Sequence, residues 1–134
     1  MANVVSHDLF PTKIHEFEYT PEHYDYTNMV QYIESKNQSA PLYQTEDDIH
    51  TISFFKDFRE HIIDINKNIL NELEYDYEDI TITNMWGNIL RPQSQRAHAP
   101  HSHSNNFLSG VFYLKTSSDT SPIQFFDPRP QSSV

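Results

Sequence analysis

A chain of 134 residues, 37% of them hydrophobic and 13% aromatic, has enough apolar material for one folded domain. The formal net charge of -10 disfavours nucleic acid as a partner, because so acidic a surface repels phosphate backbones. The lack of cysteine excludes disulfides and thiolate metal sites, and the presence of only two glycines excludes a glycine-rich phosphate loop. No apolar stretch approaches the roughly 20 residues of a membrane-spanning helix and no signal peptide is recognisable, so we expect a soluble, cytoplasmic protein.

The first half of the sequence predicts mainly helices. Residues 8–19 indicate a strand, and apolar residues at helical spacing then predict a helix near 22–36, followed by a polar loop at 37–44. Thr45 suits the start of a second helix, because its hydroxyl can cap the first turn and the three acidic residues after it interact favourably with the helix dipole. This helix is amphipathic over about seven turns. Its apolar positions follow at steps of three or four: Ile49, Ile52, Phe55, Phe58, Ile62, Ile65, Ile69 and Leu73.

The second half of the sequence changes to the alternating pattern of strands. A β-prone run at 80–90 precedes a polar loop at 91–100, and strands are predicted at 107–115 and 123–126, on either side of a turn of small polar residues. Helices first and strands second are typical of an α+β domain. We therefore predict a single domain over 1–134, with helical support at 20–76 and strands at 80–134.

Three of the eight histidines fall within six residues, at His98, His101 and His103. Pro100 biases the chain toward an extended backbone, in which residues i and i+2 point the same way. His101 and His103 would then present two imidazoles to one metal ion, and neutral imidazole suits iron, zinc, copper or nickel. His98 lies an odd number of residues from this pair, so its side chain would point to the opposite side of an extended chain. The alternative is a set of exposed loop histidines that binds nothing, and an oxygenase site of two histidines needs a carboxylate as well.

The alternation after His103 extends this prediction to neighbouring positions. If the extended phase continues, Ser109 and Tyr113 share the face of the histidines. On the opposite face, apolar side chains would point into the core: Leu108, Phe112 and Leu114. A bulge at 104–106 would invert this assignment.

Three stretches of the sequence resemble a family of 2-oxoglutarate/Fe(II) oxygenases found in phages and marine bacteria. They are Met-Trp-Gly-Asn at 85–88, the run His-x-His-x-x-x-x-Leu-Ser-Gly-x-x-Tyr-Leu at 101–114, and Phe-Asp-Pro-Arg at 126–129. The central run is long and specific. The resemblance implies N-terminal helices packed on a partial double-stranded β-helix (jelly roll), similar to that of prolyl hydroxylases. It also implies Fe(II) as the metal, 2-oxoglutarate as cosubstrate, and hydroxylation coupled to oxidative decarboxylation of 2-oxoglutarate.

By the same resemblance, His101 and His103 are metal ligands. A histidine stands at 103 where related enzymes often have a carboxylate, so Asp127 is a further candidate ligand, with a structural role in its turn as the alternative. Trp86 either lines the pocket or belongs to the core. The candidates for binding the cosubstrate are Tyr113, Ser109 and Asn88.

The sequence departs from the family pattern after 129. The family carries a distal histidine ligand and an arginine that pairs with 2-oxoglutarate, whereas no histidine follows His103 here. We therefore expect a C-terminally truncated member of the fold, incomplete or inactive by itself. Expected partners are a small-molecule or protein substrate, a second copy of the chain or a complementing C-terminal fragment, in the host cytoplasm if the protein is viral.

Two other classes of function stay open. One is a non-catalytic β-sandwich module that binds or builds a phage structure, which would fit the loss of the distal ligand. The other is a cupin-type metal protein. Cupins place a glutamate shortly after their His-x-His motif, and Asn105 and Asn106 stand there instead, which argues against this class.

Overall fold

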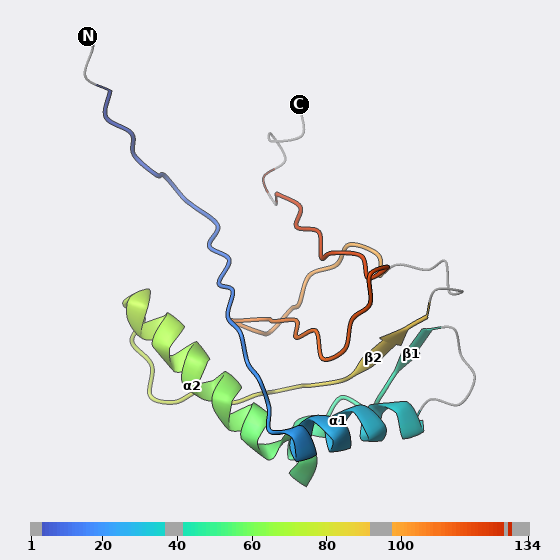
Figure 1. Cartoon of the computed structure of the whole chain (residues 1–134). Helices are drawn as coiled ribbons and strands as arrows, with labels where there is room; N and C mark the ends of the chain where they lie inside the picture. The colour runs from blue at the N-terminus through green and yellow to red at the C-terminus, as the bar shows by residue number, and fades with distance from the viewer. Residues whose placement is uncertain (1–3, 37–41, 92–97, 128, 130–134) are drawn as a thin grey trace.

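The computed structural model describes residues 4–36, 42–91, 98–127 and 129. Within these ranges the chain forms two α-helices, two short strands and two 3-10 turns (Figure 1). In chain order they are α1 (His23–Lys36), β1 (Leu42–Gln44), η1 (Ile49–Thr51), η2 (Ser53–Phe55), α2 (Lys56–Glu72) and β2 (Asn88–Leu90). None of the described helices is both long and apolar enough to cross a membrane.

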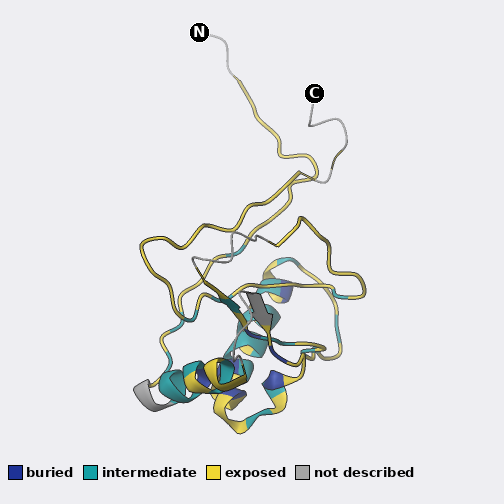
Figure 2. Ribbon diagram, turned by 90° about the vertical axis from the view of Figure 1, so that its right-hand side faces the viewer, coloured by how far each residue is buried: buried dark blue, intermediate teal, exposed yellow. Residues whose placement is uncertain are grey.

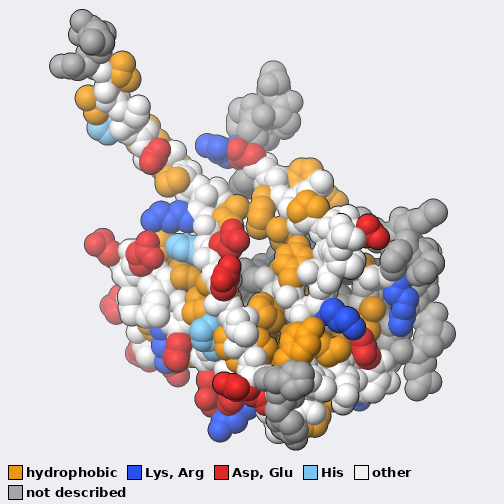
Figure 3. Space-filling model, viewed as in Figure 1, with side chains coloured by type: hydrophobic (Ala, Val, Ile, Leu, Met, Phe, Trp, Pro, Cys, Tyr) orange, Lys and Arg blue, Asp and Glu red, His pale blue; other side chains and the backbone are white. Residues whose placement is uncertain are grey.

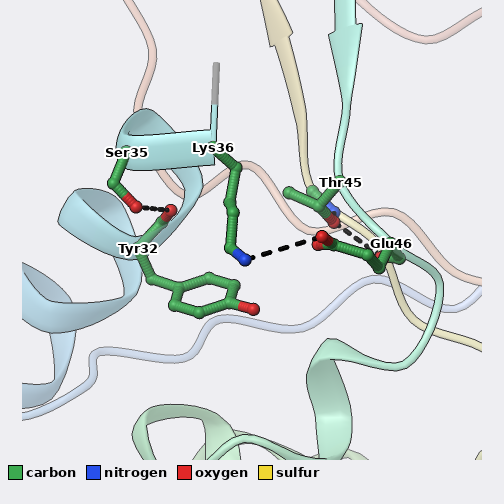
Figure 4. Close-up of polar contacts among 6 residues, drawn as sticks. Tyr32, Ser35, Lys36, Thr45 and Glu46 are labelled. Atoms are coloured by element: carbon green, nitrogen blue, oxygen red, sulfur yellow. Dashed lines mark hydrogen bonds and ion pairs between the residues drawn. The ribbon is translucent and has the colours of Figure 1, made fainter. Parts of the chain in front are cut away.

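Helix α1 confirms the prediction made from helical spacing at 22–36. Met29 is only 1% exposed, and Tyr32 and Ile33, one turn further along, pack against the same core. Near the end of the helix, the Lys36 ammonium lies 3.5 Å from the Glu46 carboxylate, across the gap between α1 and the segment after β1 (Figure 4). This ion pair is exposed and contributes little to stability. Apolar burial therefore holds α1 in place.

The prediction of one long helix from Thr45 is wrong. The regular helix begins only at Lys56, and the two 3-10 turns before it are separated by Ile52 in an extended conformation (φ −75°, ψ 138°). The reason is competition for backbone hydrogen bonds. The Ile49 N–H, which a helix from Thr45 would use internally, donates to the Met85 carbonyl at 3.2 Å, and the Met85 N–H donates to Asp47 at 2.8 Å. Pairing with this distant segment replaces the first turns of the predicted helix.

The two strands form an antiparallel pair in which Tyr43 faces Ile89. Strand β1 lies at the end of the stretch predicted to be a polar loop, so the boundary of that loop was wrong. Strand β2 lies within the β-prone run predicted at 80–90. An isolated parallel bridge between Asp48 and Met85 continues the contact beyond β2.

The core lies between α1, the 3-10 turns and the first half of α2. Its buried side chains are Met29, Ile49, Phe55 and Phe58. The ring of Phe58 lies 5.6 Å from that of Tyr19 and 4.8 Å from that of Phe112, so segments from both ends of the chain reach the same aromatic cluster. In Figure 2 the buried residues lie on the helices and the adjoining inner segments, while the two terminal segments are mostly exposed.

The strands predicted at 8–19, 107–115 and 123–126 are absent from the structure, which describes all three segments without regular secondary structure. A strand needs a neighbour for its N–H and C=O groups. Within the described stretch 98–127, the recorded backbone hydrogen bond is that from Thr120 to Ser117, which closes a turn. In the described structure these segments therefore have the composition of strands but lack the backbone hydrogen bonds to a neighbouring strand.

The alternation predicted for 108–114 is confirmed at Phe112 and Leu114 but is wrong at Leu108, which is 37% exposed and does not belong to the core. Phe112 and Leu114 pack against the core, whereas Val111 is 64% exposed and Tyr113 is 47% exposed. Further exposed aromatic side chains lie along the same C-terminal segment, among them Phe107, Phe125 and Phe126. Figure 3 shows hydrophobic side chains gathered on this part of the surface.

Gly87 lies where the segment leading into β2 passes against Ile33 of α1. A Cβ atom at this position would lie 2.7 Å from Ile33 Cδ1, inside van der Waals contact. The Gly87 N–H donates a hydrogen bond to the hydroxyl of buried Thr45 at 3.0 Å, and the Thr45 N–H donates to the Gly87 carbonyl at 3.0 Å. The predicted N-cap residue Thr45 therefore serves instead to hold this segment against the core.

Replacing Gly87 by alanine should destabilise the fold by about 1–3 kcal/mol, because the added methyl group forces the β-branched side chain of Ile33 to move. Urea unfolding followed by circular dichroism measures the loss. Gly110→Ala is the matched control, since nothing lies within 4 Å of a Cβ there, and it should change stability by less than about 0.5 kcal/mol. Equal losses in both variants would contradict the tight approach of Gly87 to α1.

Candidate metal centre

The imidazole rings of His101 and His103 lie side by side on the exposed segment before the turn at 104–105. Their centroids are 5.0 Å apart, with an angle of 56° between the ring planes. With metal–nitrogen distances of about 2.1 Å and angles at the metal of about 90–110°, two imidazoles that share one ion have centroids roughly 5 Å apart. The pair predicted from the i, i+2 spacing is thus brought together at a separation that suits one metal ion.

A backbone carbonyl sets the tautomer of the neutral His101 ring. Its Nδ1 lies 2.8 Å from the Ala99 oxygen. A carbonyl can only accept, so the hydrogen sits on Nδ1 and the lone pair of the neutral ring is on Nε2. Histidine ligands of metals commonly donate their other ring N–H in this way, which fixes both the tautomer and the ring orientation. His101 therefore has a free Nε2 for a metal while its ring is tied to the backbone.

Two further rings flank the pair. The indole of Trp86 lies nearly parallel to His103, at 21° with centroids 6.0 Å apart, which is an offset stack. The ring of His98 lies 6.5 Å from that of His101 at 57°. The sequence suggested Trp86 only as a pocket or core residue. Its contact with His103 joins positions 17 residues apart, for which the sequence carries no periodic signal.

The extended phase does not run on past the histidines. Residues 104 and 105 form a turn, and Asn105 has a left-handed backbone with φ 63°. Asn106 then accepts a hydrogen bond from the Thr83 hydroxyl at 2.6 Å, which ties the end of the turn to the run before β2. The condition for placing Ser109 and Tyr113 on the face of the histidines is thus not met, and their role stays a prediction.

Among the described residues, none of the contacts recorded for the ring cluster involves the other predicted residues. Ser109 and Tyr113 are exposed, and the structure records no hydrogen bond for either side chain within its described ranges. Asn88 opens β2 opposite Gln44, two residues after Trp86, and is exposed.

Asp127 is engaged by Arg129, two residues further along the chain. The Arg129 N–H and Nε both donate to its Oδ1, at 3.0 and 2.9 Å, and the guanidinium also contacts Oδ2. These hydrogen bonds from Arg129 lower the pKa of the Asp127 carboxyl to about 2. The contacts support the structural role that the sequence left as the alternative. Among the described residues, no cluster of three His, Asp or Glu side chains is placed to hold a metal ion.

A comparison with known families covers this part of the chain. Residues 84–134 match a family model described as "Putative 2OG-Fe(II) oxygenase". This match supports the family resemblance seen in the sequence, over these residues. No curated protein and no solved structure matches the chain.

The oxygenase segment, as we call residues 84–134, contains the whole ring cluster and Asp127. It begins next to Met85, whose backbone pairs with Asp47 and Ile49 and whose side chain packs against the core. Iron and 2-oxoglutarate are the metal and cosubstrate that this family implies. The paired imidazoles provide two donors of the type that Fe(II) accepts, so the residues present fit the first part of such a site.

Proposed function

We propose that the chain is an Fe(II)- and 2-oxoglutarate-dependent dioxygenase in which His101 and His103 bind the iron. One observation carries the proposal: a pair of imidazoles 5.0 Å apart lies inside the segment that matches the oxygenase family. We further propose that this segment belongs to a partial double-stranded β-helix on which the helices pack. Its substrate is a small molecule or a protein.

Bound iron, together with 2-oxoglutarate and dioxygen, would supply the chemistry that hydroxylates a C–H bond: dioxygen is the oxidant, one of its atoms enters the new hydroxyl group, and the other enters succinate as 2-oxoglutarate loses CO2. The residues of the chain would bind and orient the metal and the cosubstrate. In the neutral ring of His101, the Ala99 carbonyl keeps Nε2 free of hydrogen, and the indole of Trp86 lies nearly parallel to the ring of His103. The hydroxyls of Ser109 and Tyr113 and the amide of Asn88 are donors suited to the carboxylates of 2-oxoglutarate. We assign these three side chains to the cosubstrate.

A carboxylate ligand must complete the set of two histidines. The oxygenase segment contains only two acidic residues, Asp119 and Asp127. Asp127 is our candidate, since a carboxylate ligand must be ionised and an aspartate is ionised at neutral pH. To bind iron it has to exchange its contacts with the guanidinium of Arg129 for the metal.

A non-catalytic binding module is the second candidate function. It is favoured by the lack of a three-residue cluster for a metal among the residues that the structure describes. In that case the oxygenase segment keeps the sequence pattern of the family and has lost the chemistry. The two functions differ in whether the chain binds iron and 2-oxoglutarate together.

An anaerobic titration of the purified chain with Fe(II) and 2-oxoglutarate distinguishes them. An oxygenase site should produce the visible charge-transfer band of 2-oxoglutarate bound to iron, and His101→Ala should abolish this band. His7→Ala is the control, because His7 lies in the exposed N-terminal segment and should leave the band unchanged. If the wild-type chain gives no band, the oxygenase proposal is overturned in favour of the binding module.

A further inference from the structure

We infer that Trp86 is a positioning residue for the metal site, holding the ring of His103 in the orientation that lets it share an ion with His101. This inference rests on the proposed function, since it concerns the same two histidines. It assigns a role to a side chain outside the ligand set. The two sides of the stack are held to the fold with different firmness.

The indole side of the stack is anchored on both flanks. Before Trp86, the Met85 N–H donates to Asp47 at 2.8 Å and the Met85 carbonyl accepts from Ile49 at 3.2 Å. After it, Gly87 exchanges hydrogen bonds with buried Thr45 and lies against Ile33 of α1. With both neighbours fixed to the core, the backbone of Trp86 has little freedom to move.

The histidine side is exposed. His101 and His103 are both solvent-exposed, and the hydrogen bond recorded for them, from His101 to Ala99, is local. The first tie to the rest of the fold after them is the bond between Thr83 and Asn106, three residues beyond His103. Within the described ranges, the stack on Trp86 is therefore the contact that joins the histidine pair to the core.

The geometry of the stack suits this role. Nearly parallel rings fix the plane of the imidazole but leave its edge open, and the ring nitrogens lie on that edge. Trp86 would therefore restrict the ring of His103 without blocking its nitrogens. His101 is restrained by a hydrogen bond and His103 by an aromatic face. Each of the two ligand rings is thus held in orientation by a neighbouring group, as is common for the ligands of metal sites.

Trp86 is the single tryptophan of the chain, so its emission reports on its own contact. We expect Co(II), a redox-stable probe for the Fe(II) site, to quench this emission in step with the visible absorbance of bound Co(II). His103→Ala should lose both signals. Co(II) absorbance that develops without any change in emission would mean that the ion binds away from Trp86, which would overturn the inference and leave metal binding intact.

Variants at position 86 test positioning directly. Trp86→Leu should weaken Co(II) binding, measured by absorbance, by about tenfold, whereas Trp86→Phe keeps an aromatic face and should stay within about threefold of wild type. A metal-free readout accompanies them: the indole ring current should displace the His103 proton resonances in wild type, and Trp86→Leu should remove that displacement. Wild-type affinity in a folded Trp86→Leu chain would overturn the inference alone. Absence of Co(II) binding in every variant would overturn the proposed metal site together with it.

Discussion

Phe58→Ala should destabilise the chain by about 3–5 kcal/mol, the largest loss that we expect from one side chain. Phe58 is 8% exposed, and its ring contacts Tyr19 from the segment before α1 and Phe112 from the C-terminal segment. Truncation leaves a cavity at the point where three parts of the chain meet. Because small domains are stable by only about 5–15 kcal/mol, this variant should be close to unfolding.

Phe54→Ala is the matched control for this prediction. It removes the same atoms four residues earlier, from a side chain that is 38% exposed and meets Tyr32 only edge to face at 6.5 Å. Its loss should be well below that of Phe58→Ala. Urea unfolding of the two variants, followed by circular dichroism, gives the comparison. Equal losses would mean that the aromatic cluster around Phe58 is not the centre of the fold.

His101→Ala and His103→Ala should each weaken binding of a divalent metal by about 100-fold or more. Removing a group that only hydrogen-bonds to a ligand already lowers metal affinity by about 10–100-fold, and removing the ligand itself should cost at least as much. Each variant leaves one imidazole, and a single exposed histidine holds such ions weakly. Calorimetric titration with Co(II) measures the affinities. The fold should be unaffected, because both side chains are exposed and contribute nothing to the core.

His98→Ala is the control within the same segment. Its ring lies 6.5 Å from that of His101, further than the 5.0 Å within the pair. The sequence places its side chain on the opposite side of an extended chain, and we expect its removal to change the affinity by less than about threefold. A loss as large as that of His101→Ala would instead make His98 a ligand and contradict the assignment of the pair.

The parts of the fold that the sequence predicts well are those decided locally. Helix α1 follows from apolar spacing alone, and the alternation at 111–114 correctly separates Phe112 and Leu114 from their exposed neighbours. The i, i+2 spacing of His101 and His103 likewise needs only an extended backbone, and the two rings lie together. In each case the side-chain direction depends on the backbone period over a few residues.

The parts that it misses are decided by distant residues. Thr45 has every local feature of a helix cap, yet its hydroxyl and N–H bond to Gly87, 42 residues away. The stack of Trp86 on His103 is likewise a long-range contact, and no local pattern in the sequence at either position predicts it. The strand-like stretches at 107–115 and 123–126 show the reverse: composition favours a strand, but a strand forms only where a neighbour accepts its hydrogen bonds.

The most direct test of the metal site is the long-range proton–nitrogen NMR spectrum of the eight imidazoles during titration with a diamagnetic probe, Zn(II). Ligation moves the nitrogen resonance of the bonded atom, and each ring is assigned through its alanine variant. We predict that the Nε2 of His101 and a nitrogen of His103 shift together at one equivalent of metal, while the Nδ1 of His101 keeps its hydrogen. Resonances of the pair that stay in place while other histidines shift would contradict the assignment of His101 and His103 as the metal ligands.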